Sequence, residues 1–271
     1  MKLLSNMLHR VVYGPLPKPF AALTDSPLDF VSPEAMQPVV ADYQRDKTAW
    51  RLNHLPLVVG QLRPEVMTAL TGTATDPDIK FSNGLIAPDF EICARQITRG
   101  LKRNLELVPQ QKEHMQHNLV ALWAGVAQAI LEQDQKWFGE PTVASFILNR
   151  EVILPPSRHG KGRGRYTYAG KWHRDALTDD NGAVSRLYLM RTTNPMRMLP
   201  NDLTEGFKDN AEGDVIDHRL PTLAARAARR PDPGQIVLVN GGHQYGSVHA
   251  ANVPKPGEGG PSCFIAVNCV I

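Results

Sequence analysis

The chain has 271 residues, 42% of them hydrophobic, and its 30 basic and 27 acidic side chains give a net charge of +3. This composition is typical of a globular protein with one large or two small domains, and it lacks the long basic tract of a nucleic-acid-binding protein. No apolar run approaches the ~20 residues that span a bilayer, and three scattered cysteines are too few for a disulfide framework, so we expect a cytoplasmic protein without a membrane partner.

The front of the chain is expected to be helical or irregular. Prolines are spaced through the first 33 residues, whereas glycines concentrate from residue 139 onward. Helices are predicted over residues 95–107 and 110–138, with Pro109 between them. The second helix is the clearest element, because its apolar residues recur at helical spacing and form one core-facing stripe. The stripe comprises Leu119, Leu122, Trp123, Val126 and Ile130.

The pattern changes after Pro141. Six short segments, rich in β-branched and aromatic residues, are separated by Gly, Pro, Asn and Asp turns. They predict antiparallel strands of a sandwich or jelly roll, in an α+β protein whose residues 1–141 pack on a core of residues 142–271 within one integrated domain. A short helix is expected over 220–230, and Cys263 and Cys269 are expected to pack as small hydrophobic residues. The six segments are 143–154, 165–172, 184–191, 235–240, 245–251 and 263–271.

The sequence KWHRD places His173 and Asp175 two residues apart at the end of a predicted strand. Residues i and i+2 of a strand point to the same face, so the imidazole and the carboxylate can converge on one ion. A third ligand is expected from GGHQYGSVHAA, which supplies His243 and His249. Two imidazoles and one carboxylate leave three coordination positions of an iron open, as an oxygen-activating site requires.

The run from KWHRD through PGQIVLVNGGHQYGSVHAANVP to CFIAVN resembles the Fe(II)/2-oxoglutarate-dependent dioxygenase superfamily, over residues 142–271. The resemblance implies a double-stranded β-helix, a jelly-roll or cupin-like barrel with N-terminal support helices, and an HxD…H metal triad. It also implies Fe(II), 2-oxoglutarate and dioxygen, with 2-oxoglutarate converted to succinate and carbon dioxide while a substrate is hydroxylated. Asp175 argues against halogenation, because related halogenases have a small residue in place of this carboxylate.

The resemblance favours His249 as the third ligand, because it precedes the Pro/Gly-rich connection VPKPGEGGP and the last strand. The catalytic and metal-binding residues are therefore predicted to be His173, Asp175 and His249. His243 shares the strand parity of His249 and remains the alternative.

The co-substrate site departs from the family pattern. Many members place an arginine on the last strand for the far carboxylate of 2-oxoglutarate, whereas this chain reads GPSCFIAVN, with Ser262 near that position. A buried carboxylate needs a partner, so Arg186 and Arg191 are the predicted cofactor-binding cations, together with Ser262. The two arginines have opposite strand parity, so at most one is expected to face inward. Arg150 and Arg165 are the fallback cations.

Three functions remain open at this point. The first is hydroxylation of a small polar or acidic metabolite, such as an amino-acid derivative. A nucleic-acid partner is not expected for this function, and a homo-oligomer is left open. The second is hydroxylation of a protein or nucleic acid docked on the basic loop RHGKGRGR at residues 158–165. The third is a cupin-like protein that binds metal or ligand without turnover. Aromatic residues before the motif and polar residues after it are expected to line the pocket: Tyr166, Tyr168, Trp172, Asn268 and the segment 194–202.

Overall fold

The computed structural model describes residues 26–72, 79–86, 109–139, 143–153, 171–175, 185–210, 214–242, 245–252 and 259–270. The helices are α3 (Pro33–Arg45), α4 (Lys47–His54), α5 (Pro64–Thr71), α7 (Pro109–Phe138), α8 (Asn201–Thr204) and α9 (Leu220–Ala227). The strands are β1 (Leu28–Phe30), β2 (Leu57–Leu62), β3 (Ile79–Ile86), β4 (Val143–Ile153), β5 (Ser185–Arg191), β6 (Arg197–Met198), β7 (Gln235–Gly241), β8 (His249–Ala250) and β9 (Gly260–Val270).

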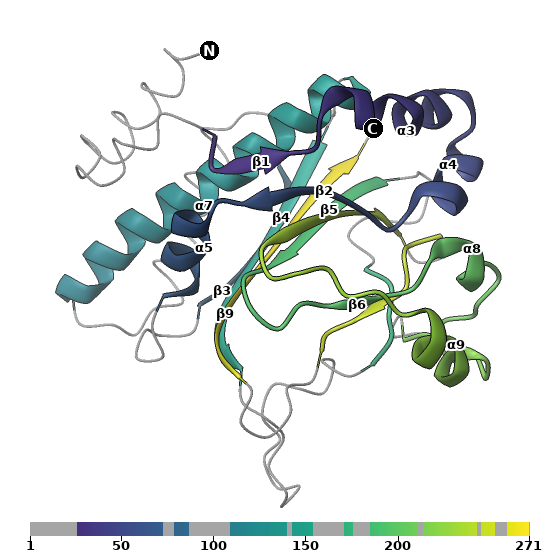
Figure 1. Ribbon diagram of the computed structural model, residues 1–271. Helices are drawn as coiled ribbons and strands as arrows, with labels where there is room; N and C mark the ends of the chain where they lie inside the picture. The colour runs from purple at the N-terminus through teal and green to yellow at the C-terminus, as the bar shows by residue number, and fades with distance from the viewer. Residues whose placement is uncertain are drawn as a thin grey trace, which may run out of the picture.

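Seven strands form one antiparallel sheet in the order β1-β2-β7-β5-β9-β4-β3 (Figure 1). At its centre β5 pairs with β7 and β9, so that Leu187 lies opposite Val239 on one side and Asn268 on the other. A second, two-stranded sheet pairs β6 with β8. The described fold is therefore a mixture of helices and antiparallel sheet, as the sequence predicted.

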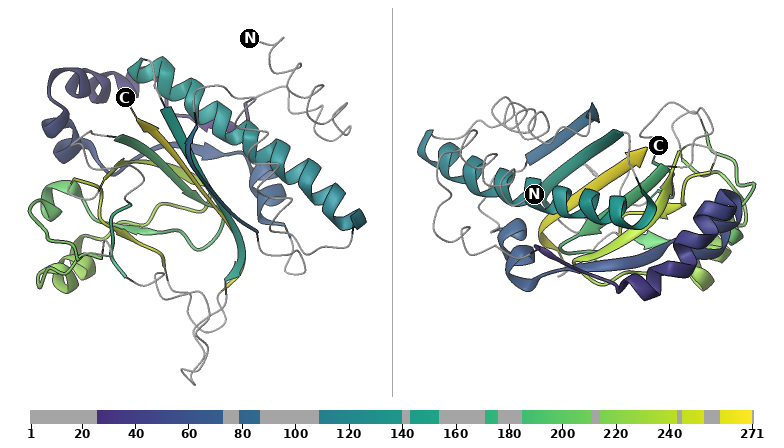
Figure 2. Two further views of the ribbon diagram at one scale, coloured as in Figure 1. Left: turned by 180° about the vertical axis from the view of Figure 1, so that it is seen from behind. Right: turned by 90° about the horizontal axis from the view of Figure 1, so that it is seen from above.

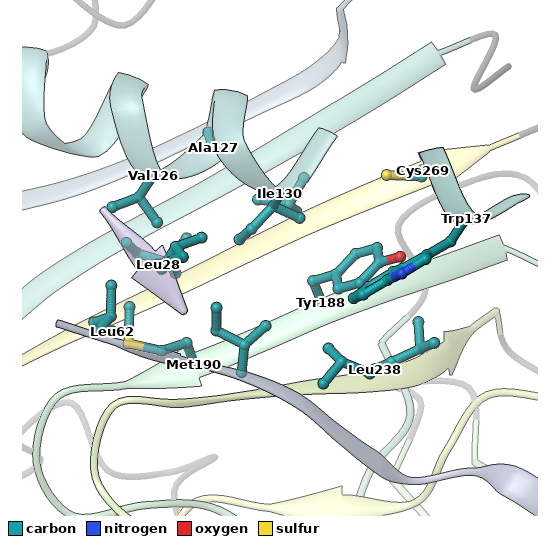
Figure 3. Close-up of a cluster of buried hydrophobic side chains, with 14 of the residues drawn as sticks. Leu28, Leu62, Val126, Ala127, Ile130, Trp137, Tyr188, Met190, Leu238 and Cys269 are labelled. Carbon is teal, nitrogen blue, oxygen red and sulfur yellow. The ribbon is translucent and has the colours of Figure 1, made fainter. Parts of the chain in front are cut away.

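One face of the large sheet packs against helices. The apolar side of α7 contributes Val126, Ala127 and Ile130 to a core that also contains Tyr188 and Met190 of β5 (Figure 3). Seen from behind, α7 runs along this face of the sheet (Figure 2). Burial of these side chains removes apolar surface from water and is the main force that holds helix and sheet together.

The opposite face of the large sheet packs against the small one. Because side chains alternate along a strand, Leu187 and Leu189 point away from the helices. They form a second cluster with Val237, Val239 and Met198, the last of which belongs to β6. We call this side of the large sheet, which faces the small sheet, the interior face.

Several elements agree with the sequence analysis. The predicted helix over 110–138 is α7, the strands predicted over 143–154 and 184–191 are β4 and β5, and the helix over 220–230 is the shorter α9. Cys263 and Cys269 are buried in the hydrophobic core, as predicted. None of the helices in the described part of the chain is long and apolar enough to cross a membrane.

The front half contains three strands that the sequence analysis did not predict. Strands β1, β2 and β3 join the large sheet, with β2 paired to β7. They escaped prediction because β1 has only 3 residues, β2 is 6 residues between two short helices, and Ser82 and Gly84 interrupt β3. The helix expected over 95–107 lies outside the described residues.

Candidate metal centre

Two histidines are brought together by direct backbone pairing. The amide of His173 donates to the carbonyl of His249 at 2.8 Å, and the amide of His249 donates back to His173 at 3.0 Å. Residues paired in this way across two antiparallel strands project their side chains to the same face. The two rings lie 4.5 Å apart between centroids, and β6 holds the other edge of β8 by pairing Met198 with His249. Both imidazoles therefore face the interior.

Asp175 completes the cluster. It follows His173 by two residues in extended backbone, and its carbonyl accepts the amide of Gly242 at 2.9 Å, which fixes the chain after the motif. The distance from His173 Nε2 to Asp175 Oδ1 is 3.6 Å, and that from His249 Nε2 to Asp175 Oδ2 is 3.3 Å. One ligand atom from each of the three residues lies within 4.8 Å of the others. The predicted triad is therefore a cluster in space.

The second nitrogen of each imidazole is held by a backbone carbonyl. His173 Nδ1 lies 3.0 Å from the carbonyl oxygen of Lys171, and His249 Nδ1 lies 3.0 Å from that of Ser247. A carbonyl only accepts, so Nδ1 carries the hydrogen in both rings and donates it. Each Nε2 is left with a lone pair directed toward Asp175, which is the arrangement that metal-binding histidines adopt.

These residues fit a divalent transition metal. Two imidazole nitrogens and a carboxylate oxygen are the donor set of a facial site with open positions. Ligand atoms at metal distances of about 2.1 Å on one octahedral face lie roughly 3 Å apart, which is close to the 3.3 and 3.6 Å found here. The side chains of His249 and Asp175 are 3% and 21% exposed, so one side of the cluster is enclosed.

Proximity of the three groups shifts their pKa values. Burial, together with the charge of His249, lowers the pKa of His173. Burial alone would lower the pKa of His249, but the charge and hydrogen bond of Asp175 raise it above its usual value. Burial alone would raise the pKa of Asp175, but His249 and then His173 bring it below its usual value. Without metal, Asp175 is ionised and His249 is the histidine that holds a proton more tightly.

Arg174, between the two ligands of the motif, points to the other side of the small sheet. It is buried, and its guanidinium donates to the carbonyls of Gly246 at 2.9 Å and of Phe207 and Thr204 at 3.3 Å, and pairs with Asp209. This side chain ties the ligand segment to the turn that precedes His249. Arg174 was not among the predicted site residues, although strand alternation puts it on the face opposite His173 and Asp175.

The structure corrects the expectation for Arg186. Its side chain lies on the helical face of the large sheet, is 0% exposed and pairs with both carboxylate oxygens of Asp134 on α7, at 2.7 Å each. Its remaining nitrogen donates to the Tyr43 hydroxyl at 2.7 Å. Strand parity separates this group from the triad, so Arg186 is a structural residue and is no longer a candidate for binding 2-oxoglutarate.

Arg191 and Ser262 share the interior face. Arg191 lies four residues beyond Leu187 on β5, and its guanidinium carbon sits 5.3 Å from the ring centre of Phe264 on β9. Its charge acts to lower the pKa of His249, which places it within electrostatic reach of the triad. Ser262 is buried two residues before Phe264, and its hydroxyl donates to the carbonyl of Thr193 at 3.0 Å.

Other predicted residues are placed elsewhere. Trp172 does not line the interior face: it packs on the outer side of the small sheet with Leu199 and Val248, and Arg197 lies over its ring at 5.0 Å. Arg150 is on β4, opposite Cys263 in the register. The predictions for Arg165, Tyr166, Tyr168, His243 and the loop 158–165 concern positions outside the described residues.

No family model and no curated protein matches the sequence. Solved structures that resemble the fold include Fe(II)/2-oxoglutarate-dependent dioxygenases. The Arabidopsis thaliana dioxygenase for auxin oxidation 1, with 2-oxoglutarate, has 13% identity and a TM-score of 0.33, over 99% of this chain and 88% of that one. A full-length Neurospora crassa protein in complex with α-ketoglutarate has 12% identity and a TM-score of 0.33, over 75% and 77%. The dioxygenase TqaL has 11% identity and a TM-score of 0.34, over 99% and 88%.

The identities and TM-scores of these neighbours are low, so the case for a function depends on the geometry of the triad in this chain.

Proposed function

We propose that the protein is an Fe(II)- and 2-oxoglutarate-dependent oxygenase, with His173, Asp175 and His249 as the iron ligands. The observation that carries the proposal is the convergence of the two Nε2 atoms on one carboxylate, at 3.6 and 3.3 Å, with both Nδ1 atoms held by carbonyls. An iron held at one face has three positions left for a bidentate co-substrate and dioxygen. Hydroxylation of a small polar metabolite is the proposed outcome.

We further propose that the two sheets are the halves of a double-stranded β-helix. Support comes from single backbone bridges that extend the small sheet on both sides of β6 and β8. His173 bridges to His249 and to Asp214, and Met198 bridges to Arg229. This second layer faces Leu187 and Leu189 of the large sheet through the cluster that contains Met198. The metal ligands would then lie inside the barrel.

Arg191 is the proposed partner of the far carboxylate of 2-oxoglutarate, with Ser262 beside it. Arg191 is the β5 arginine that shares the interior face, and its planar guanidinium can grip a carboxylate through two hydrogen bonds. Ser262 can accept a further hydrogen bond or rotate its hydroxyl toward the ligand. This assignment supplies a cation in place of the arginine that is missing from the last strand.

The roles of this chain's residues follow from their protonation. Bound iron would supply the chemistry that couples oxidative decarboxylation of 2-oxoglutarate to substrate oxidation. Asp175 provides the negative charge that offsets the metal, and the carbonyls of Lys171 and Ser247 fix the ring orientations. His249 must release its proton before it can bind metal, because Asp175 raises its pKa in the free protein.

Anaerobic absorption spectroscopy of the Fe(II) protein, with and without 2-oxoglutarate, tests the proposal. A visible charge-transfer band that depends on both components is expected for wild type and is lost in Asp175→Ala and His249→Ala. The matched control is His218→Ala, whose side chain is 91% exposed and should leave the band unchanged. Arg191→Met should bind metal normally and weaken 2-oxoglutarate affinity at least about tenfold, since a charged hydrogen-bond pair is lost. Iron binding without any 2-oxoglutarate band would instead favour the non-catalytic, cupin-like alternative.

A further inference from the structure

Two uncharged polar side chains lie buried on the interior face without partners. Among the described residues, neither the Ser185 hydroxyl nor the oxygen and nitrogen of the Asn268 amide has a hydrogen-bond partner. Ser185 is 1% exposed and Asn268 is 0% exposed. Burying such groups unpaired costs about 1–3 kcal/mol each, so native proteins rarely keep them unless another function requires them.

The two side chains form one group. Ser185 lies opposite Gly241 and Leu187 lies opposite Asn268, so both polar residues share the face of Leu187. A methyl group placed on Gly241 would clash with the Ser185 hydroxyl and would lie 3.4 Å from the Asn268 side-chain oxygen. The lack of a side chain at Gly241 therefore leaves room for both polar groups. We call Ser185, Gly241 and Asn268 the neutral polar cluster.

The neutral polar cluster adjoins the triad. Gly242, the next residue after Gly241, donates its amide to the carbonyl of Asp175 at 2.9 Å. His249 and Asp175 face the same space between the sheets as Ser185 and Asn268 do. A molecule that contacts the cluster would therefore lie beside the metal ligands.

The cluster is separate from the proposed co-substrate cation. Arg191 and Ser185 lie six residues apart on β5, and Ser262 and Asn268 lie six residues apart on β9, which corresponds to about 20 Å along an extended strand. 2-Oxoglutarate is too short to reach both ends. The other arginine of β5, Arg186, is on the opposite face and paired with Asp134. The cluster thus offers hydrogen bonds but no charge.

We infer that the neutral polar cluster binds an uncharged amide-type group of the prime substrate, one with a donor and an acceptor side by side. The Asn268 amide can donate to a carbonyl oxygen and accept from an adjacent N–H, while the Ser185 hydroxyl can do either. A carboxylate would meet the Asn268 oxygen without either arginine of β5 beside it, because Arg186 faces the helices and Arg191 lies at the far end of the strand, and its burial would be disfavoured. This inference rests on the proposed function and narrows its substrate from polar or acidic metabolites to neutral ones.

Binding of two matched probes tests the inference. Cyclopentanecarboxamide and cyclopentanecarboxylate have the same shape, and their affinities can be measured by ligand-observed NMR on the full chain, with and without Fe(II) and 2-oxoglutarate under anaerobic conditions. Wild type is expected to bind the amide at least about tenfold more tightly than the carboxylate, and Asn268→Leu should lose about tenfold in amide affinity. Asn268→Asp, which replaces the donor by an acceptor, should lose a similar amount. Asn53→Leu, at an exposed position on α4, is the control and should change nothing.

A stability measurement separates a binding role from a structural one. If Asn268 exists for a ligand, Asn268→Leu should raise the Tm by about 2–4 °C, because an unpaired polar group is replaced by an apolar one of similar shape. A lower Tm for Asn268→Leu would show that buried water satisfies the amide. Equal or tighter binding of the carboxylate probe by wild type would show that the ligand class is wrong. Either result overturns the inference. The Fe(II)–2-oxoglutarate band should persist in Asn268→Leu. Absence of this band in wild type would defeat the proposed function. Amide binding to the metal-free chain could still be measured in that case, so the two proposals can fail separately.

Discussion

The ion pair between Asp134 and Arg186 leads to the largest expected change in stability. Both side chains are 0% exposed, and the guanidinium contacts both carboxylate oxygens at 2.7 Å. Although burial alone would lower the pKa of Arg186, its hydrogen bonds to Asp134 and the charge of that residue raise it, so the arginine stays charged. Asp134→Leu would leave this charge buried and unpaired, at a cost of about 3–5 kcal/mol.

Removing both charges should recover most of that loss. In Asp134→Leu/Arg186→Met neither charge of the pair remains, and the remaining deficit should be about 1 kcal/mol, because the Tyr188 hydroxyl also loses its acceptor on Asp134. Urea unfolding, with the linear slope checked between variants, gives the free energies. The single variant should also lower the Tm by roughly 6–20 °C for a protein of this size.

Two results would refute this account of the pair. The first is a cost of less than about 1 kcal/mol for Asp134→Leu, and the second is simple addition of its effect to that of Arg186→Met in the double variant. Either result would mean that the buried charge of Arg186 does not need the Asp134 carboxylate to offset its loss of hydration. The double variant should also keep the 2-oxoglutarate band, since Arg186 faces away from the triad.

Three further predictions concern the metal centre. Because Asp175 raises the pKa of His249, this histidine is protonated in the metal-free site when the pH is below the raised pKa. Metal affinity should therefore fall as the pH is lowered through the pKa of His249. Co(II) titration calorimetry in buffers of different ionisation enthalpy should detect the proton that is released on binding. Gly246→Ala would place a methyl group in collision with the carbonyl oxygen of Gly242, so metal affinity, measured by equilibrium dialysis, should fall about 10–100-fold. Gly125→Ala is the control, because a methyl group there has nothing within 4 Å, and it should leave the affinity unchanged. Arg174→Met removes the hydrogen bonds that this guanidinium donates to Asp209 and to several carbonyls, and it should lower the free energy of unfolding by about 2–4 kcal/mol. An unchanged urea midpoint would show that the turn before His249 is held by other contacts.

The clustering of His173, Asp175 and His249 was predictable because it follows from strand alternation and one motif. His173 and Asp175 had to share a face if the segment was extended, and the cluster with His249 agrees with that expectation. Parity also predicted that Arg186 and Arg191 would point to opposite sides of β5. It could not say which side was the interior, because that depends on where α7 packs and on Asp134, which lies 52 residues away in the chain.

The neutral polar cluster shows what the sequence alone does not reveal. A serine and an asparagine on strands are ordinary residues, and their lack of partners becomes visible only when Ser185, Gly241 and Asn268 are set in register on three strands. Strands β1 and β2 were missed for a similar reason, since segments this short are stabilised by their pairing partners, β2 for β1 and β7 for β2, more than by their own sequence.

The paired backbones of His173 and His249 have a consequence for how the proposed metal would be bound and released. Two main-chain hydrogen bonds join these segments. In small zinc domains the ion supplies the folding free energy, and chelators unfold them. Here a chelator should remove the metal and leave amide exchange at both positions slow. Metal binding can then follow folding, so a folded chain that has lost its ion can bind another without unfolding or new synthesis.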